Sequence, residues 1–271
     1  MTKPHIVQLV DDAIDVLDPR NPMRSARQLV RTCFVDRDNH RLLHHHRGAF
    51  WQFQSNHYAS ADTETIRTAA WKFLESAKCK RGKAVVPFKP TRARVSDVLD
   101  ALAAACNLDS GIDPPAWLGD VGDLPPACEM LAVANGLLHL PMQELYRVTP
   151  THFGLSASEV VFEPRAPEPA NWQAFLRDLF GADAESITTL QDWFGYALAS
   201  DTSQQKILLL VGPRRSGKGT IARVLTWPRH RGRPDLGRPA IELRTSAVDW
   251  QIAGGYLRRT AGRKVGPGNP R

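Results

Sequence analysis

Residues 206–225, KILLLVGPRRSGKGTIARVL, decide how the later part of this chain folds. The apolar run from Ile207 to Val211 predicts a buried strand, and a helix-like pattern follows the glycine-rich loop. A strand, a glycine-bracketed loop with a lysine and then a helix is the order of a phosphate-binding P-loop. In such a loop, backbone N–H groups and the N-terminus of the helix face an anion. The stretch therefore predicts the opening of an α/β nucleotide-binding domain.

The P-loop template G-x-x-x-x-G-K-[ST] is matched from Gly212 to Lys218, with Gly219 at its last position. Lys218 can reach the β- and γ-phosphates of a nucleoside triphosphate, so ATP with Mg²⁺ is the expected ligand. Thr220, one place later, is the nearby hydroxyl that can serve Mg²⁺. The predicted binding residues are Gly212, Pro213, Arg214, Arg215, Ser216, Gly217, Lys218, Gly219 and Thr220. The alternative is a glycine-rich loop that only closes a buried strand.

Composition favours a protein of the cytoplasm. The 271 residues are 42% apolar, enough for a core, and the four cysteines are far apart with no C-x-x-C pair. Neither a zinc site nor a disulfide framework is indicated by that spacing. No apolar run approaches the roughly 20 residues that span a membrane, and the N-terminus does not have the pattern of a signal peptide. We therefore expect a cytoplasmic location and no membrane segment.

The net charge of +7 is unevenly placed. Residues 1–226 hold 25 basic and 25 acidic side chains, so residues 227–271 account for the whole excess. Within the balanced part, residues 72–94 hold eight basic side chains against Glu75 alone. A basic segment predicts contact with a polyanion, whereas a solvated connector is the alternative. The candidate DNA-binding residues are Lys78, Lys80, Arg81 and Lys83.

Hydrophobic spacing predicts an α-rich N-terminal region with small hairpins. Residues 48–58 are expected to form two short strands, and residues 135–148 a hairpin turning near Pro141 and Met142. Residues spaced by three and four predict helices over 62–78, from Ser96 onward, over 172–180 and over 187–198. Gly181 is expected to end the third of these helices.

Some residues invite a functional interpretation that their spacing does not favour. His44, His45 and His46 alternate faces of a strand, so they cannot all converge on one metal ion. A structural or solvent-facing role is expected for them. The tryptophans at core spacings are expected to pack inside rather than stack on bases: Trp51, Trp71, Trp172 and Trp193.

From about Ser25 to Thr226 the chain resembles the phage and plasmid primase–helicase family of superfamily III, which is related to the poxvirus nucleoside triphosphatase. The resembling pieces follow the family's order: HHHRGAFWQFQSNHY, IRTAAWKFLESA, VSDVLDALAA, PPAWL, LAVANGLLHL, NWQAFLRDLFGAD and LQDWFGYALASDTSQQKILLLVGPRRSGKGTIARVL. The resemblance implies an AAA+-like ATPase that assembles as a homo-oligomeric ring, commonly a hexamer. Such rings translocate on DNA during phage or plasmid replication, often fused to a primase domain.

On the P-loop the resemblance carries over to Gly212, Gly217, Lys218 and Thr220, while Gly219 occupies the usual hydroxyl position. It implies that Lys218 stabilises transition-state charge if the site is active. The expected organisation has four parts. These are an N-terminal extension (1–24), a primase–helicase connector domain of α+β type (25–170), a helical lead-in with the first strand, P-loop and helix of the ATPase domain (171–226), and a basic, disordered tail (227–271).

After Thr226 the resemblance ends. Arg, Gly, Pro and Ala make up 25 of the 45 residues in 227–271, which is typical of G+C-rich DNA translated out of frame. Re-read one base forward with permitted codons, residues 239–264 can give the family's continuation, including an apolar strand that ends in Asp. We therefore expect a truncated, frameshifted relative with a non-native tail. A Walker B acid, a sensor and an arginine finger are not identifiable in the present frame.

The leading hypothesis is an ATP-dependent DNA helicase of phage, prophage or plasmid replication, primase-associated and catalytically impaired. Nucleotide binding is expected to be weak or absent, and ATP hydrolysis negligible. One alternative is a DNA- or partner-binding fragment without catalysis. Another is a small-molecule P-loop kinase, suggested by the GKGT ending. Such kinases usually place the P-loop near the N-terminus, which argues against the last alternative here.

Overall fold

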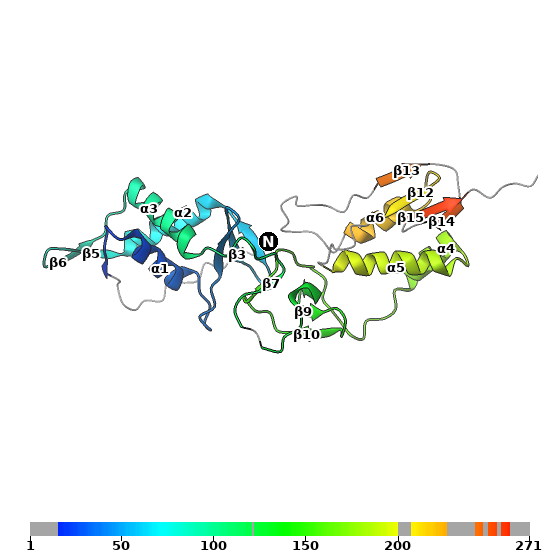
Figure 1. Ribbon diagram of the computed structural model, residues 1–271, viewed down its shortest axis with the longest axis horizontal. Helices are drawn as coiled ribbons and strands as arrows, with labels where there is room; N and C mark the ends of the chain where they lie inside the picture. Colours follow the sequence, from blue (N-terminus) through cyan, green and yellow to red (C-terminus); the bar gives the residue numbers. More distant parts are fainter. Residues whose placement is uncertain are drawn as a thin grey trace, which may run out of the picture. The chain divides into compact units, whose positions relative to one another are not determined.

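The computed structural model describes residues 16–120, 122–199, 207–226, 242–245, 249–253 and 256–260, and it has a mixed α/β architecture (Figure 1). The chain divides into two compact units. Of the described residues, the first contains those of 16–127 and 147–156, and the second contains those of 128–146 and from 157 onward.

Three helices build the core of the first unit: α1 (Pro22–Cys33), α2 (Thr63–Ser76) and α3 (Arg92–Ala105). The helix predicted over 62–78 is confirmed as α2, with Ile66, Ala70 and Phe73 on its buried face. The start predicted at Ser96 is wrong, because α3 begins at Arg92. The hydroxyl of Thr91 accepts a hydrogen bond from the backbone N–H of Arg94 at 3.4 Å and so caps the helix earlier.

The core between these helices is apolar and closely packed. Its least exposed members come from all three helices and from the strand that follows α1: Ala26, Leu29, Leu43, Ile66, Ala70, Leu74, Val95, Leu102 and Cys106. Burial of these side chains supplies the hydrophobic stabilisation of the unit.

An antiparallel sheet of β2 (Leu43–His46), β3 (Ala49–Phe53) and β4 (Tyr58–Ala61) confirms the two strands predicted over 48–58. A second pair of strands, β7 (Ala116–Trp117) and β11 (His152–Phe153), lies in the same unit. Phe153 is fully buried, and its ring lies against those of His44, His46 and Tyr58. These contacts confirm the structural role expected for His44 and His46.

The expected placement of the tryptophans holds only in part. Trp51 is 6% exposed and packs in the aromatic cluster beside Tyr58. Trp172 and Trp193 are half-buried against the core of the second unit. Trp71 is 37% exposed, so its expected burial is wrong. It follows the buried Ala70 along α2 and therefore points away from the core face of that helix.

Residues 78–94, expected as a connector, contain a β-hairpin. Strands β5 (Lys78–Arg81) and β6 (Ala84–Pro87) pair antiparallel, and β1 (Val16–Leu17) runs parallel to β5 on its other side. Gly82 occupies the turn with φ +64°, a conformation that glycine adopts without steric cost. The buried Cys79 alternates with charged neighbours, which is why the pattern resembled a solvated connector.

The second unit contains a three-stranded antiparallel sheet of β8 (Met130–Val133), β9 (Gly136–His139) and β10 (Glu144–Tyr146), preceded by a 3-10 turn, η1 (Ala127–Glu129). The hairpin predicted over 135–148 is confirmed by β9 and β10. The ring nitrogen Nε2 of the buried His139 lies 2.8 Å from Oε2 of Glu129, which ties the sheet to the turn before it.

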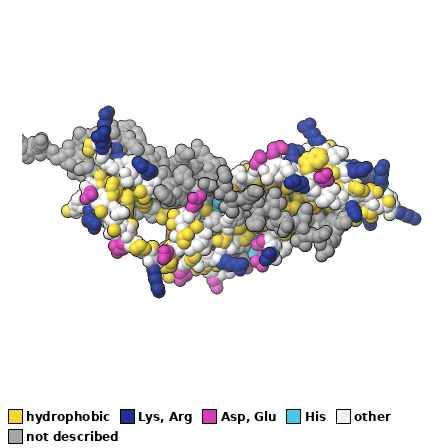
Figure 2. Space-filling view, turned by 180° about the vertical axis from the view of Figure 1, so that it is seen from behind, with side chains coloured by type: hydrophobic (Ala, Val, Ile, Leu, Met, Phe, Trp, Pro, Cys, Tyr) yellow, Lys and Arg dark blue, Asp and Glu magenta, His cyan; other side chains and the backbone are white. Residues whose placement is uncertain are grey.

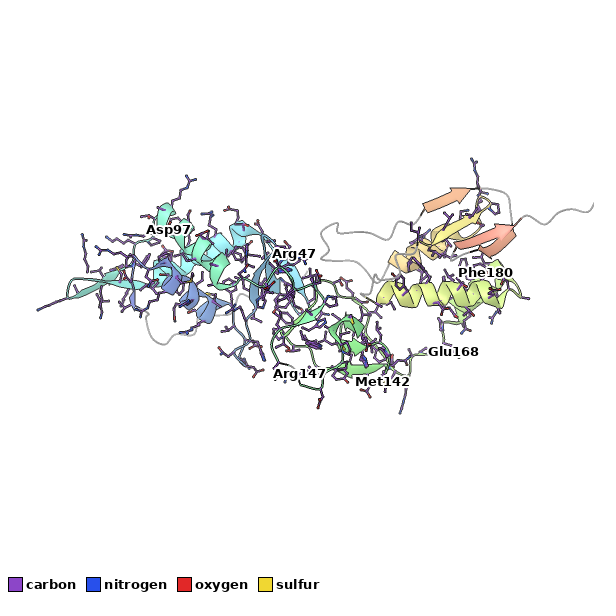
Figure 3. All side chains as sticks on the ribbon, viewed as in Figure 1. Arg47, Asp97, Met142, Arg147, Glu168 and Phe180 are labelled. Carbon is purple, nitrogen blue, oxygen red and sulfur yellow. The ribbon has the colours of Figure 1, made fainter. Side chains whose placement is uncertain are left out.

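Helices α4 (Ala170–Phe180) and α5 (Ala184–Leu198) confirm the two amphipathic helices predicted there. Gly181 ends α4 with φ +62°, as expected, and its N–H donates to the carbonyl of Arg177 at 2.7 Å. Phe180, labelled in Figure 3, is buried at the end of α4. Together the two helices lead into the predicted P-loop.

The predicted strand and helix around the P-loop are β12 (Leu209–Gly212) and α6 (Lys218–Thr226). The sheet holds four strands in the order β13–β12–β15–β14, where β13 is Glu242–Thr245, β14 is Asp249–Ala253 and β15 is Tyr256–Thr260. β13 and β15 both run parallel to β12. The tail expected to be disordered thus contributes three strands, and its other residues lie outside the described part of the chain.

Candidate nucleotide-binding site

The strand and helix of the site are fixed by an apolar cluster. Leu208 and Leu210 are 2% and 0% exposed on the strand side, and Ile221 of α6 is fully buried. They pack with Leu176 and Phe180 of α4 and with Leu190 of α5. The cluster anchors both ends of the loop, so the residues between Gly212 and Lys218 have a restricted conformation.

Lys218 lies folded back onto the loop that precedes it. Its ammonium group donates to the carbonyls of Gly212 at 2.8 Å and Pro213 at 2.7 Å, and to the hydroxyl of Ser216 at 3.1 Å. The side chain is only 7% exposed, and no ion pair joins it to a carboxylate within the described residues. A buried cation with only neutral acceptors is electrostatically under-compensated, which favours binding of an anion beside it.

Gly217 is held between the loop and α4. Its φ is +76°, and a Cβ built on it would lie 2.9 Å from Cζ of Phe175. Its carbonyl accepts hydrogen bonds from the backbone N–H groups of Thr220 at 2.9 Å and Ile221 at 3.1 Å, which begins α6. A side chain is therefore excluded twice at this position, by backbone conformation and by space.

A cavity of about 560 Å³ lies directly against the loop. Its volume is in the range of about 300–1,000 Å³ common for small-molecule sites. Of the predicted binding residues, five line this cavity: Arg215, Ser216, Gly217, Gly219 and Thr220. Gly212, Pro213 and Lys218 are joined to them through the hydrogen bonds of the ammonium group. Arg214 is exposed and does not line the cavity.

The cavity is also lined by residues that the sequence patterns did not indicate: Phe175, Asp178, Leu179 and Arg223. Phe175 and Leu179 were expected only as core residues of α4, and they do pack against the cluster. Asp178 is the one carboxylate that lines the cavity within the described residues. The helical period identifies the residues of α4 that face the core. It cannot show which residues beside that face lie against the P-loop, because the loop is distant in sequence.

The geometry fits a Mg²⁺-bound nucleotide in part. Thr220 is exposed at the cavity and is the hydroxyl that can reach a metal ion. A Cβ built on Gly219 would meet nothing within 4 Å, so the absent hydroxyl at that place reflects residue choice and not lack of room. The strands that run parallel to β12 end at Thr245 and Thr260, neither of which is a carboxylate.

The candidate DNA-binding residues lie in the first unit, on the β5–β6 hairpin. Lys80, Arg81 and Lys83 are exposed, and Lys78 is half-buried where β5 pairs with Val16 of β1. All four belong to a single hairpin, whereas the other basic residues of the predicted segment lie on α2, on α3 and between β6 and α3.

A cluster of Asp36, Asp38 and His40 has potential metal-ligating atoms within 4.8 Å of one another. A turn accounts for it. Oδ1 of Asp36 accepts from the N–H groups of Asp38 at 3.0 Å and His40 at 2.7 Å, and Oδ2 lies 3.0 Å from Nδ1 of His40. This is the local side-chain-to-backbone pattern of an Asx turn, so no metal is needed to explain the cluster.

No protein-family model matches this chain, and a search of curated proteins found no significant match. Among the described residues, no helix combines the length and the apolar character that crossing a membrane requires.

Proposed function

We propose that the second unit is a nucleoside triphosphate-binding P-loop module, derived from a DNA-replication motor of the superfamily III primase–helicase type. The observation that carries the proposal is the buried ammonium group of Lys218, which has only neutral acceptors and lies at the N-terminus of α6. A helix N-terminus and a nearby cation both favour an anion at the same place. Phosphate is the anion that this loop pattern takes.

Each loop residue has a definite role in the proposal. Backbone N–H groups of residues 214–219 surround the phosphates, and Lys218 exchanges the loop carbonyls for phosphate oxygens. Thr220 would hold Mg²⁺, which supplies charge neutralisation on the phosphates when bound. Phe175 and Leu179 offer an apolar wall on the side of α4.

Hydrolysis is expected to be negligible. Phosphoryl transfer to water needs an acid to hold Mg²⁺ and orient the nucleophile, and an arginine finger to neutralise transition-state charge. The parallel neighbours of β12 end without a carboxylate, at Thr245 and Thr260. Asp178 of α4 also lines the cavity, but its negative charge would repel phosphate oxygens close to it. The proposed module therefore binds nucleotide without efficient turnover.

Titration with a fluorescent ATP analogue in the presence of Mg²⁺ tests the proposal. Lys218→Ala should weaken binding at least about tenfold, because a charge-assisted hydrogen bond is worth roughly 1.5–3 kcal/mol. The matched control is Arg214→Ala, which removes one cation from the same loop but does not touch the cavity. Its effect should stay within about twofold, the scale of an exposed charge.

The outcomes separate the two parts of the proposal. Binding that is absent, or that Lys218→Ala leaves unchanged, would overturn nucleotide binding at the loop. Steady release of phosphate that depends on Lys218 would instead overturn the expected loss of hydrolysis.

The basic β5–β6 hairpin of the first unit favours a second candidate function, the binding of DNA without catalysis. We propose DNA as the macromolecular partner in either case, and a homo-oligomeric ring and a cytoplasmic location for the active form of such a motor. Salt-dependent DNA binding that survives Lys218→Ala would support the non-catalytic candidate.

A further inference from the structure

A cavity of about 1180 Å³ lies in the first unit, where β1, β5 and β6 meet the residues at the start of α1 and α3. Six basic side chains from these separate segments line it: Arg20, Arg24, Lys80, Arg81, Lys89 and Arg94. Asp18 is the one acidic residue among the described residues that line it. We call this cavity the cationic groove. Figure 2 shows Lys and Arg side chains gathered at the end of the unit that carries the hairpin.

The charges of the cationic groove are not compensated from within the described protein. None of the six side chains is joined to a described carboxylate by an ion pair. Five of the six are exposed, and Arg94 is half-buried. Like charges around one concavity repel one another and concentrate a positive potential, so an anionic ligand lowers the electrostatic energy of the folded unit.

Arg94 is held in place at the groove. Its Nη1 donates to the carbonyls of Phe88 at 3.4 Å and Lys89 at 3.1 Å, and its guanidinium lies 5.7 Å from the centre of the Phe88 ring. A guanidinium has five N–H donors, so donors remain for a ligand oxygen. Four of the six groove cations are arginines, which match the geometry of phosphate oxygens.

We propose that the cationic groove binds a single strand of nucleic acid through its phosphodiester backbone. The cavity volume of about 1180 Å³ exceeds the range of about 300–1,000 Å³ common for small-molecule sites, which favours a few linked nucleotides over a mononucleotide. The exposed Lys83 continues the positive charge past the turn of the hairpin, which Figure 1 shows projecting beyond the helices of the unit. A ligand longer than a mononucleotide can use this extension.

The groove contacts the backbone of the strand and not its bases. Phe88 is the aromatic side chain among the described residues that line it, and it is 3% exposed beneath Arg94. Stacking of bases needs an exposed ring. Binding should therefore be strongly salt-dependent and nearly independent of base sequence.

Of these six cations, Lys80 and Arg81 were named as candidates and Lys89 and Arg94 lie in the predicted basic segment 72–94, whereas Arg20 and Arg24 were not indicated. The four outside the hairpin are brought to the same cavity by the pairing of β1 with β5 and by the early start of α3. The inference rests on the proposed function in one respect, since it locates the DNA partner named there. Its experiment does not depend on the P-loop.

Fluorescence anisotropy of the full chain with a labelled oligothymidine provides the test. A length of about 20 nucleotides exceeds the ~4–16 nucleotides that a comparable site covers. The groove variant combines Arg24→Gln, Lys80→Gln and Arg81→Gln. The control variant combines Arg31→Gln, Arg37→Gln and Lys72→Gln, which are exposed positions of the same unit outside the groove lining. Both variants keep residues 227–271, so the basic tail contributes equally to each.

The groove variant should weaken binding at least about tenfold near 0.1 M salt, and it should flatten the plot of log affinity against log salt by about 2. The expected change in slope follows from the loss of three phosphate contacts, each of which contributes roughly 0.7 on a single strand. The control variant should change affinity less than about threefold. Lys218→Ala should leave oligothymidine binding unchanged, and the groove variant should leave nucleotide binding unchanged, so the two proposals fail separately.

Three outcomes would overturn the inference. The first is an equal loss in the groove and control variants, which would indicate non-specific attraction. The second is a duplex bound as tightly as the single strand with the same dependence on the groove. The third is inorganic tripolyphosphate displacing the oligothymidine at the same phosphate concentration, which would indicate a small polyphosphate as the ligand.

Discussion

Gly217 and Gly219 are two residues apart, but they differ in backbone conformation and in the space around them. Gly217 has φ +76° and touches Phe175, whereas Gly219 faces open space at the start of α6. Gly217→Ala should destabilise the second unit by at least about 1–2 kcal/mol, the cost of a left-handed backbone for a residue with a Cβ. Gly219→Ala should stabilise it by about 0.5–1 kcal/mol, because alanine favours a helix. Urea unfolding followed through the tryptophans of α4 and α5 measures both, and equal effects would contradict the loop geometry.

The open space at Gly219 also permits a functional test of the metal site. Gly219→Ser places a hydroxyl where the resembling family usually has one, and the added Cβ would meet no atom within 4 Å. If Thr220 is a poor substitute for that hydroxyl, nucleotide affinity should rise several-fold in Mg²⁺ and stay unchanged in EDTA. Gly219→Ala is the matched control, since it shares the gain in helix propensity but adds no oxygen. A similar gain in both variants would assign the effect to the helix alone.

His44 gives the first unit a pH-dependent stability. Burial, with the nearby charges of Arg41 and His46, lowers the pKa of His44 from 6.5 to about 4. Between these values the unfolded chain binds more protons, so stability is fully present above about pH 6.5 and is lost as pH falls toward about 4. His44→Phe should flatten part of this dependence in urea unfolding at several pH values. His45→Phe removes a histidine from the same strand as a control, and an identical flattening there would refute the assignment.

Part of the candidate nucleotide-binding site could not be predicted from the sequence, for a reason that is visible in its individual residues. The P-loop pattern specifies Lys218 and its glycines because their roles depend on the local backbone. Phe175 and Asp178 reach the cavity only through the packing of α4 against the loop, across a sequence separation that no local period encodes. The groove cations Arg20 and Lys89 are likewise brought together by strand pairing.

At the scale of elements, α5 is capped by the residue that precedes it, Asp183. The carboxylate of Asp183 accepts from the N–H of Ser186 at 3.0 Å and from its hydroxyl at 2.6 Å, and both bonds lower its pKa. Asp183→Ala should destabilise the second unit by about 1 kcal/mol, the usual value of such a cap. The difference should shrink as pH falls below the usual range of an Asp, where wild type loses the charged form. Asp192→Ala, at an exposed position within α5, should change stability little; a loss equal to that of Asp183→Ala would contradict the capping role.

Helices were predicted more successfully than strands. The faces of α2, α4 and α5 follow the helical period because each buries one stripe against a core. The β5–β6 hairpin was missed, since it is largely exposed and its alternation involves a single buried residue, Cys79. The early start of α3 was missed because Arg92 and Arg94 continue the basic segment, and composition obscured the cap at Thr91.

At the scale of the whole molecule, the buried clusters are confined to one unit each. Two clusters lie in the first unit, and the cluster around Leu210 lies in the second. The sequence predicted four parts, with the helical lead-in to the P-loop beginning at residue 171. It could not indicate that residues 147–156 return to the first unit, because β11 pairs with β7 through contacts that are distant in sequence.

Because each unit has its own buried clusters, we expect each unit to have its own free energy of unfolding. Leu102 and Leu210 are both fully buried, one in each unit, so either alanine substitution should cost about 2–5 kcal/mol. Hydrogen exchange measured by mass spectrometry should show faster exchange only within the unit that carries the substitution, because each buried cluster of the described residues lies within a single unit. Leu102→Ala should accelerate exchange in α1–α3 and leave α4–α6 unchanged, and Leu210→Ala should do the reverse. Equal acceleration in both units by either variant would show that the chain unfolds as one cooperative body, and the nucleotide and strand-binding proposals would then need tests at matched stability.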